Sequence, residues 1–171
     1  AELHHNMGVF PVRNFQEGRL KGIENLAVDA FHSLKTGQFG CYSCMIRCGQ
    51  IHQVTSGPYA GTWSEGPEYE TIWAFGGDTA VTELGAVIAA DALCDLLGLD
   101  TISMGNSIAF AMELYQRGVL SRQDCDGLEL SWGNHEAMLE LIKKVARREG
   151  IGDLLADGVK RAAERLGRGA A

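Results

Sequence analysis

Three of the five cysteines lie within eight residues, in the segment GQFGCYSCMIRCGQIHQV that begins at Gly37. Cys41, Cys44 and Cys48 have the spacing Cys-x2-Cys-x3-Cys, so three thiolates on one tight turn can converge on a single point. Soft thiolate ligands of this kind select zinc or an iron–sulfur cluster. The sequence therefore predicts a metal centre on this turn.

Two metal centres fit the three cysteines. A [4Fe-4S] cluster usually takes four thiolates and is the favoured interpretation, with its fourth ligand elsewhere. Structural zinc of the Cys3His type is the alternative, because His52 follows Cys48 at a Cys-x3-His spacing. A third interpretation, unliganded cysteines in a core, explains the clustering poorly.

The two remaining cysteines carry a weaker signal. Cys94 lies near the apolar face of a predicted helix, where a buried, inert thiol is expected. Cys125 lies in the polar loop SRQDCDG and is interpreted as a surface residue rather than a cluster ligand. An odd number of cysteines argues against a disulfide scaffold and for a reducing compartment, so we expect a cytoplasmic protein.

Length and charge restrict the class of protein. A chain of 171 residues is long enough for one domain with a buried core. Its net charge of -7 has the wrong sign for broad binding to nucleic acid. The longest apolar windows stop well short of the roughly 18 residues that cross a bilayer, and the N-terminus has no secretory-signal pattern. We therefore expect partners other than nucleic acid or a membrane.

The elements that position the cysteines are predicted to be mainly α, with little sheet. Residues 1–20 look irregular and are interpreted as a linker that packs. Apolar residues at helical spacing predict a helix over 23–34, stopped by Gly37. A short β-like piece, IHQVTS, follows the cysteines and leads into a loop rich in Gly, Ser and Pro.

Four further helices are predicted from apolar residues at helical spacing. Caps and stop signals set their ends: one over 81–97 before Gly98, one capped by Ser103 or Asn106 and ended by Gly118, one capped by Asn134, and a stripe over 155–166 before Gly167. We therefore expect a multi-helical domain with an irregular cysteine loop.

Five long motifs follow one another along the chain: GVFPVRNFQEG, CYSCMIRCG, GPEYETIWAFG, LCDLLGLDTISMGNSIAFAMELYQRGVL and GIGDLLADGVKRAAERLG. Together they resemble the tungsten-containing aldehyde ferredoxin oxidoreductase family, in the family's order and at similar separations. Family members are much longer, with an N-terminal domain that cradles a pterin cofactor and a further C-terminal stretch. The resemblance therefore implies that 1–171 is one helical domain from the middle of such a protein. Its parts would be a packed linker (1–20), a helix with the cysteine loop and a glutamate segment (21–77), and helices with a pterin motif (78–171).

The resemblance implies a role for each matching position. Cys41, Cys44 and Cys48 match three ligands of the family's [4Fe-4S] cluster, and the fourth is a cysteine expected beyond Ala171. The segment Asp95-x-x-Gly98-Leu99-Asp100 resembles one of two motifs that contact the bis-pterin cofactor. A helix that ends at Gly98 frees backbone groups, and the two flanking carboxylates can accept hydrogen bonds from pterin N–H groups.

Two glutamates are candidates for proton transfer. Glu70 matches the family's active-site glutamate best, and Glu68 is the rival. A carboxylate buried beside the apolar run that begins at Ile72 would have a raised pKa and could pass a proton. The alternative is that both are first-turn glutamates favoured by the helix dipole after Pro67.

The implied function is oxidation of an aldehyde to a carboxylic acid at a tungsten or molybdenum bis-pterin centre, with electrons passed through the cluster to ferredoxin. Ferredoxin, the aldehyde, and a second copy or a completing domain or subunit are the implied partners. The isolated chain is expected to be inactive, because it lacks parts of that site. The alternative is a non-catalytic iron–sulfur electron-transfer domain, or a zinc-stabilised structural domain or subunit that another chain completes.

Two positions depart from the family pattern. Ala89 stands where members that bridge subunits through a metal have a glutamate, so a bridging metal of that kind is not expected. Met45 follows the second cysteine, where the family often has proline, a change that is compatible with cluster binding.

Overall fold

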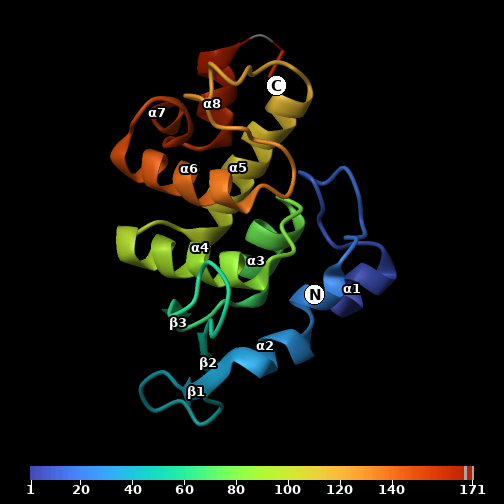
Figure 1. Ribbon diagram of the computed structural model, residues 1–171, viewed down its shortest axis with the longest axis vertical. Helices are drawn as coiled ribbons and strands as arrows, with labels where there is room; N and C mark the ends of the chain where they lie inside the picture. The colour runs from blue at the N-terminus through green and yellow to red at the C-terminus, as the bar shows by residue number, and fades with distance from the viewer. Residues whose placement is uncertain (168, 171) are drawn as a thin grey trace.

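The computed structural model describes residues 1–167, 169 and 170, and it is mainly helical with one small sheet (Figure 1). The predicted fold class is confirmed. The helical elements are α1 (Glu2–Met7), η1 (Ile23–Leu26), α2 (Val28–Leu34), α3 (Tyr69–Ile72), η2 (Trp73–Gly77), α4 (Leu84–Leu97), α5 (Thr101–Gln116), α6 (His135–Arg147), α7 (Ile151–Leu155) and α8 (Val159–Leu166). The strands are β1 (Lys35–Phe39), β2 (Gly49–Gln53) and β3 (Trp63–Ser64).

The helices α4, α5 and α6 supply most of the buried core, and their ends follow local chemistry. α4 ends at Gly98, whose left-handed φ of 68° favours glycine, and Asn134 caps α6, both as predicted. The predicted cap of α5 was wrong. Asp100, rather than Ser103 or Asn106, begins this helix, because its carboxylate accepts a hydrogen bond from the Ser103 amide at 2.7 Å.

Two N-terminal expectations were wrong. Residues 2–7 form the helix α1 instead of irregular linker. The single helix expected over 23–34 is split at Ala27, whose extended backbone, with ψ of 166°, separates η1 from α2. The helix α2 ends at Leu34, and Gly37 lies within the strand β1. The backbone groups of β1 pair with those of β2.

The sheet has the order β1-β2-β3 and is antiparallel throughout. The cysteines lie on the loop between β1 and β2, and this loop is at the lower end of the molecule in Figure 1. Gly49 pairs with Phe39 at the base of the loop, and a Cβ on Gly49 would lie 2.6 Å from the Phe39 ring. This close approach requires a glycine directly after the last cysteine.

Membrane insertion was not expected. Among the described residues, no helix is both long enough and apolar enough to cross a membrane.

Candidate functional site

The cysteine hairpin, residues 40–48, presents its sulfur atoms near the surface. Cys41 and Cys48 are exposed, Cys44 is partly exposed, and all three are free thiols. Backbone amides of Arg47 and Ile46 donate to the Cys44 sulfur and lower the pKa of its thiol. The turn therefore favours a thiolate at Cys44, the form that binds soft metals.

The hairpin alone does not close a metal site. Within 1–167, 169 and 170, no group of three or more His, Cys, Asp or Glu side chains is arranged to hold a metal ion. The side chains at the tip, Tyr42, Met45 and Ile46, are exposed. The three sulfur atoms have the chemistry of thiolate ligands.

The zinc alternative placed His52 beside the cysteines. In the structure His52 is buried on β2, where its Nδ1 donates to the carbonyl oxygen of Gly66 at 2.5 Å. Its Nε2 is also buried and has no hydrogen-bond partner within the part of the chain that the structure describes. His52 therefore holds the 64–68 segment rather than completing a group with the three cysteines.

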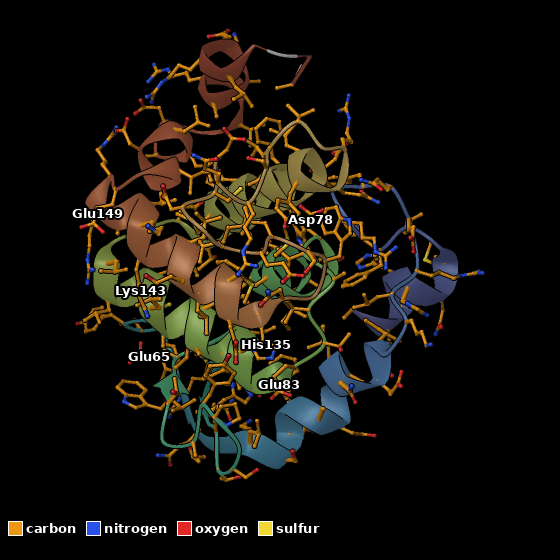
Figure 2. All side chains as sticks on the ribbon, turned by 45° about the horizontal axis from the view of Figure 1, so that its top comes forward. Glu65, Asp78, Glu83, His135, Lys143 and Glu149 are labelled. Carbon is orange, nitrogen blue, oxygen red and sulfur yellow. The ribbon has the colours of Figure 1, made fainter. Side chains whose placement is uncertain are left out.

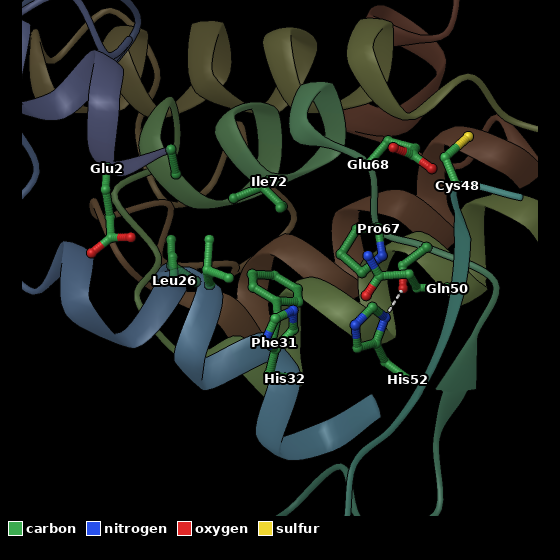
Figure 3. Close-up of a pocket in the computed structure, with 13 residues that line it drawn as sticks. Glu2, Leu26, Phe31, His32, Cys48, Gln50, His52, Pro67, Glu68 and Ile72 are labelled. Carbon is green, nitrogen blue, oxygen red and sulfur yellow. Dashed lines mark hydrogen bonds between the residues drawn. The ribbon is translucent and has the colours of Figure 1, made fainter. Parts of the chain in front are cut away.

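A pocket of about 160 Å³ lies beside the hairpin (Figure 3). It is bounded by α1, α2, β2 and the start of α3, with Phe31 and Ile72 on its apolar walls. Cys48 and Glu68 line the same end of it in Figure 3. This pocket brings Cys48, a candidate cluster ligand, together with Glu68, a candidate for proton transfer.

The two candidate glutamates differ in their surroundings. Glu68 precedes α3, and its carbonyl oxygen accepts the Ile72 amide at 3.0 Å. Glu70 lies in the first turn of α3 and does not line the pocket. Both are exposed, so the expected burial of Glu70 beside the apolar run was wrong for this chain. The apolar residues after Ile72 turn into η2 and pack inward, away from the glutamates.

The Asp-x-x-Gly-Leu-Asp motif forms the junction between α4 and α5. The Leu99 amide donates to the Cys94 carbonyl at 2.9 Å, which closes the turn at Gly98. Asp95 is exposed on the last turn of α4, whereas Asp100 caps α5, and the Ser103 hydrogen bonds lower its pKa. Residues 98–100 line a second pocket, of about 200 Å³, whose walls also include α5, α6, α7 and the start of α8. The two pockets share no lining residue.

Two buried carboxylates were missed by the sequence reasoning. Asp91 on α4 is only 6% exposed, and burial raises its pKa to about 6, opposed by a hydrogen bond from Ser64. Asp78 lies in the interior (Figure 2), and burial raises its pKa to about 7. The backbone amides of Phe15 and Asn14 partly offset this rise. An aspartate inside an apolar helical run, as in AVIAADAL, was the available signal for Asp91.

The two remaining cysteines are both buried. This confirms the inert thiol expected for Cys94 on α4. The surface position expected for Cys125 was wrong, because the turn that carries it packs its side chain into the main core. Burial raises the pKa of the Cys94 thiol to about 12 and that of Cys125 to about 11.

Comparison with known proteins identifies the family. The family model described as aldehyde ferredoxin oxidoreductase, domains 2 and 3, matches residues 1–171. The chain belongs to the aldehyde ferredoxin oxidoreductase family. This is an oxidoreductase family, and the match covers the cysteine hairpin, the glutamate segment and the α4–α5 motif together.

Curated members of the family include close relatives. The chain is 40% identical to the tungsten-containing aldehyde ferredoxin oxidoreductase of Pyrococcus furiosus, over 94% of this chain and 26% of that protein. The enzyme of the same name from Thermococcus kodakarensis is also 40% identical, over the same shares. A P. furiosus protein named aliphatic sulfonate oxidoreductase, WOR-like subunit, is 36% identical over 95% of this chain and 26% of that protein. The chain thus spans about a quarter of the length of the curated relatives it matches.

A solved structure shares the fold. The active site complex BamBC of benzoyl coenzyme A reductase, with 1,5 dienoyl-CoA, superposes with a TM-score of 0.67 and 31% sequence identity. The match covers 81% of this chain and 20% of that chain. The chain is thus similar to proteins whose names describe different reactions.

Proposed function

We propose that this chain is the helical, cluster-bearing domain of an oxidoreductase that oxidises aldehydes to carboxylic acids. In the proposal, the whole protein uses a tungsten or molybdenum bis-pterin centre and passes electrons through a [4Fe-4S] cluster to ferredoxin. The observation that carries this proposal is the three-cysteine hairpin, in which backbone amides lower the pKa of the Cys44 thiol, in a chain whose family match covers residues 1–171. When bound, the pterin-held metal supplies two-electron redox chemistry, and the cluster carries electrons singly.

The chain's own contribution to the cluster is ligation. Cys41, Cys44 and Cys48 would hold it, and the Arg47 and Ile46 amides would stabilise the thiolate form of Cys44. The exposure of the hairpin supports a fourth ligand from another part of the protein. In the proposal this ligand is a cysteine outside residues 1–171.

The contribution to the pterin centres on the α4–α5 junction, Asp95-x-x-Gly98-Leu99-Asp100. The exposed Asp95 carboxylate can accept hydrogen bonds from pterin N–H groups. One carboxylate oxygen of Asp100 is already used as the cap of α5. Asp95 is therefore the better candidate for direct contact, with Asp100 holding the turn that presents it.

The candidate for proton transfer is Glu68 rather than Glu70. Glu68 lines the pocket that Cys48 also lines, whereas Glu70 does not. A carboxylate at the end of an apolar pocket can hold and release a proton next to a bound carbonyl compound. Glu70 remains the better match to the family motif, and Glu68→Gln and Glu70→Gln separate the two.

The test uses the protein isolated without oxygen from its source cells, with whatever segments it carries there. We expect about four irons and four sulfides per protein, tungsten or molybdenum, and aldehyde oxidation with a ferredoxin-type acceptor. Cys44→Ser should remove most of the iron, and Cys125→Ala is the matched control that should leave it in place. Zinc in place of iron, or iron content unchanged by Cys44→Ser, would contradict the proposal.

A second candidate is a subunit that another chain completes. The printed name of one relative, a WOR-like subunit, favours it. In this case the 171-residue chain should copurify with a second chain and acquire activity only in its presence. Turnover of aldehyde by the 171-residue chain alone would exclude both versions.

A further inference from the structure

A series of buried hydrogen bonds joins β2, the strand after the cysteine hairpin, to α4, the helix that leads into the Asp-x-x-Gly-Leu-Asp motif. His52 on β2 donates to the Gly66 carbonyl oxygen, and the Gly66 amide donates to Ser64 Oγ at 3.2 Å. Ser64 Oγ in turn donates to Asp91 Oδ2 on α4. His52, Ser64 and Asp91 are exposed by only 3%, 2% and 6%. Gly66 is therefore held by two buried side chains, His52 at its carbonyl oxygen and Ser64 at its amide.

The packing around Gly66 is too tight for a side chain. A Cβ on Gly66 would lie 2.9 Å from Asp91 Oδ2 and 3.3 Å from the amide nitrogen of Glu68. The position of Asp91 therefore limits where the backbone can run just before Glu68. A second buried contact, between Thr71 Oγ1 and Thr101 Oγ1 at 2.9 Å, holds the following turn against the start of α5.

The charged groups that face Asp91 are both carboxylates. Asp95 lies one turn further along α4, and Glu68 faces it from the segment before α3. Ser64 and Thr71 donate hydrogen bonds to it. The negative charge of Asp91 also helps to raise the pKa of the buried Cys94 thiol. His52 lies on the other side of Gly66 and reaches Asp91 only through Ser64 and the backbone. An ionised Asp91 thus adds a third negative charge to Glu68 and Asp95.

We propose that Asp91 is a positioning residue of the candidate active site: through Ser64 it holds the 66–68 turn, and its proton state sets the charge that Glu68 faces. This rests on the proposed function, because it gives Glu68 its role. Asp91 links the glutamate segment to the helix that carries Asp95. A proton gained or lost at Asp91 therefore changes the electrostatic environment of both Glu68 and Asp95. The raised pKa, about 6, places this change near neutral pH.

The inference is tested in the 171-residue chain by NMR titration from pH 4 to 8, with no cofactor. Two signals are followed: the side-chain carboxyl carbon of Glu68 and the backbone amide of Gly66. In the wild type we expect both to show an inflection near pH 6. Asp91→Asn, which keeps an oxygen that can accept from Ser64, should remove the inflection from both signals.

Two further variants separate the two parts of the proposal. Ser64→Ala should weaken the inflection at the Gly66 amide and leave that at Glu68 unchanged, because Gly66 loses its hydrogen bond to Ser64 while both groups still feel the charge of Asp91 through space. Glu65→Gln is the matched control, an exposed carboxylate beside Ser64, and should keep both inflections. Wild-type signals without an inflection near pH 6, or an inflection that persists in Asp91→Asn, would overturn the inference.

In the source-cell protein, Asp91→Asn should remove an apparent pKa near 6 from the pH dependence of turnover while leaving the iron content unchanged. A protein without cluster or turnover would contradict the proposed function but leave the titration result standing. If the source-cell protein contains its cluster and turns over, but the 171-residue chain shows no inflection near pH 6 at Glu68 or Gly66, only the proposed role of Asp91 is contradicted.

Discussion

The helices α4 and α5 bury about half of their side chains, whereas the cysteine hairpin exposes almost all of its own. Ile108 on α5 is completely buried, and Ile46 on the hairpin is 79% exposed. The helices are held by caps, a left-handed glycine and core packing, all supplied by this chain. The hairpin has a paired base and an unpaired tip. The core of this chain thus fixes the geometry of the α4–α5 junction, whereas it leaves the tip of the cysteine hairpin in contact with solvent.

The largest expected difference between the two regions is in thiol reactivity. At pH 8 the Cys44 thiol, whose pKa is lowered, should react with iodoacetamide at least about a thousandfold faster than Cys94, whose pKa is about 12. Mass spectrometry of the metal-free chain should find label on the hairpin and none on Cys94 or Cys125. The urea-unfolded chain is the control, in which all five cysteines should react. Rapid labelling of Cys94 in the folded chain would contradict the predicted difference in reactivity between the hairpin and the helices.

Matched isoleucine truncations compare the packing of the two regions. Ile108→Ala should lower the free energy of unfolding by about 2–5 kcal/mol, because it leaves a cavity in the core. Ile46→Ala should change it by less than about 0.5 kcal/mol, because the side chain is mostly in water. Urea unfolding followed by circular dichroism measures both. A large loss for Ile46→Ala would mean that the hairpin tip packs against something in solution.

The pH dependence of stability tests the buried Asp78. Its pKa is about 7 in the folded chain and about 4 when unfolded, so the folded state holds the proton more tightly. The contribution of Asp78 to the free energy of unfolding is therefore greatest below pH 4 and falls as the pH rises to about 7. A shift of about three units corresponds to at most about 4 kcal/mol. Asp78→Asn should be more stable than the wild type above pH 7 and equal to it near pH 4, by thermal unfolding. A variant that is less stable at pH 8 would contradict this reading of the site.

The smallest expected effect distinguishes the two motif aspartates. Asp100→Ala should cost about 1 kcal/mol, because α5 loses its cap, and Asp100→Asn should recover most of it. Asp95→Ala should change the free energy of unfolding by less than about 0.5 kcal/mol, because the side chain is exposed. Equal losses at the two positions would show that the cap is not what Asp100 contributes.

Local sequence signals predicted the helical region better than the N-terminal region. Gly98 and Asn134 act within one turn of a helix, so their roles could be predicted from neighbouring residues. The strand β1 depends on pairing with β2, whose residues lie ten or more positions further along the chain. Hydrophobic spacing alone predicted a single helix there, because tertiary pairing overrides local preference.

The candidate site was predictable in residue type but not in burial. The cysteine spacing and the Asp-x-x-Gly-Leu-Asp segment were found from the sequence, and their roles stay predictions. The exposure of Glu70 and the burial of Cys125 were not, because they depend on how α3 and the 121–128 turn pack. Asp91 was missed for the same reason: its significance comes from Ser64, which is 27 positions away.

The capping role of Asp100 has an evolutionary consequence. Because its side chain begins α5, selection for a stable fold is enough to favour a capping residue at this position in a descendant, even one that binds no cofactor. Gly98, with its left-handed backbone, is under the same pressure. A relative that had changed its reaction entirely would still be expected to carry the end of this motif, whereas the exposed Asp95 would be free to drift.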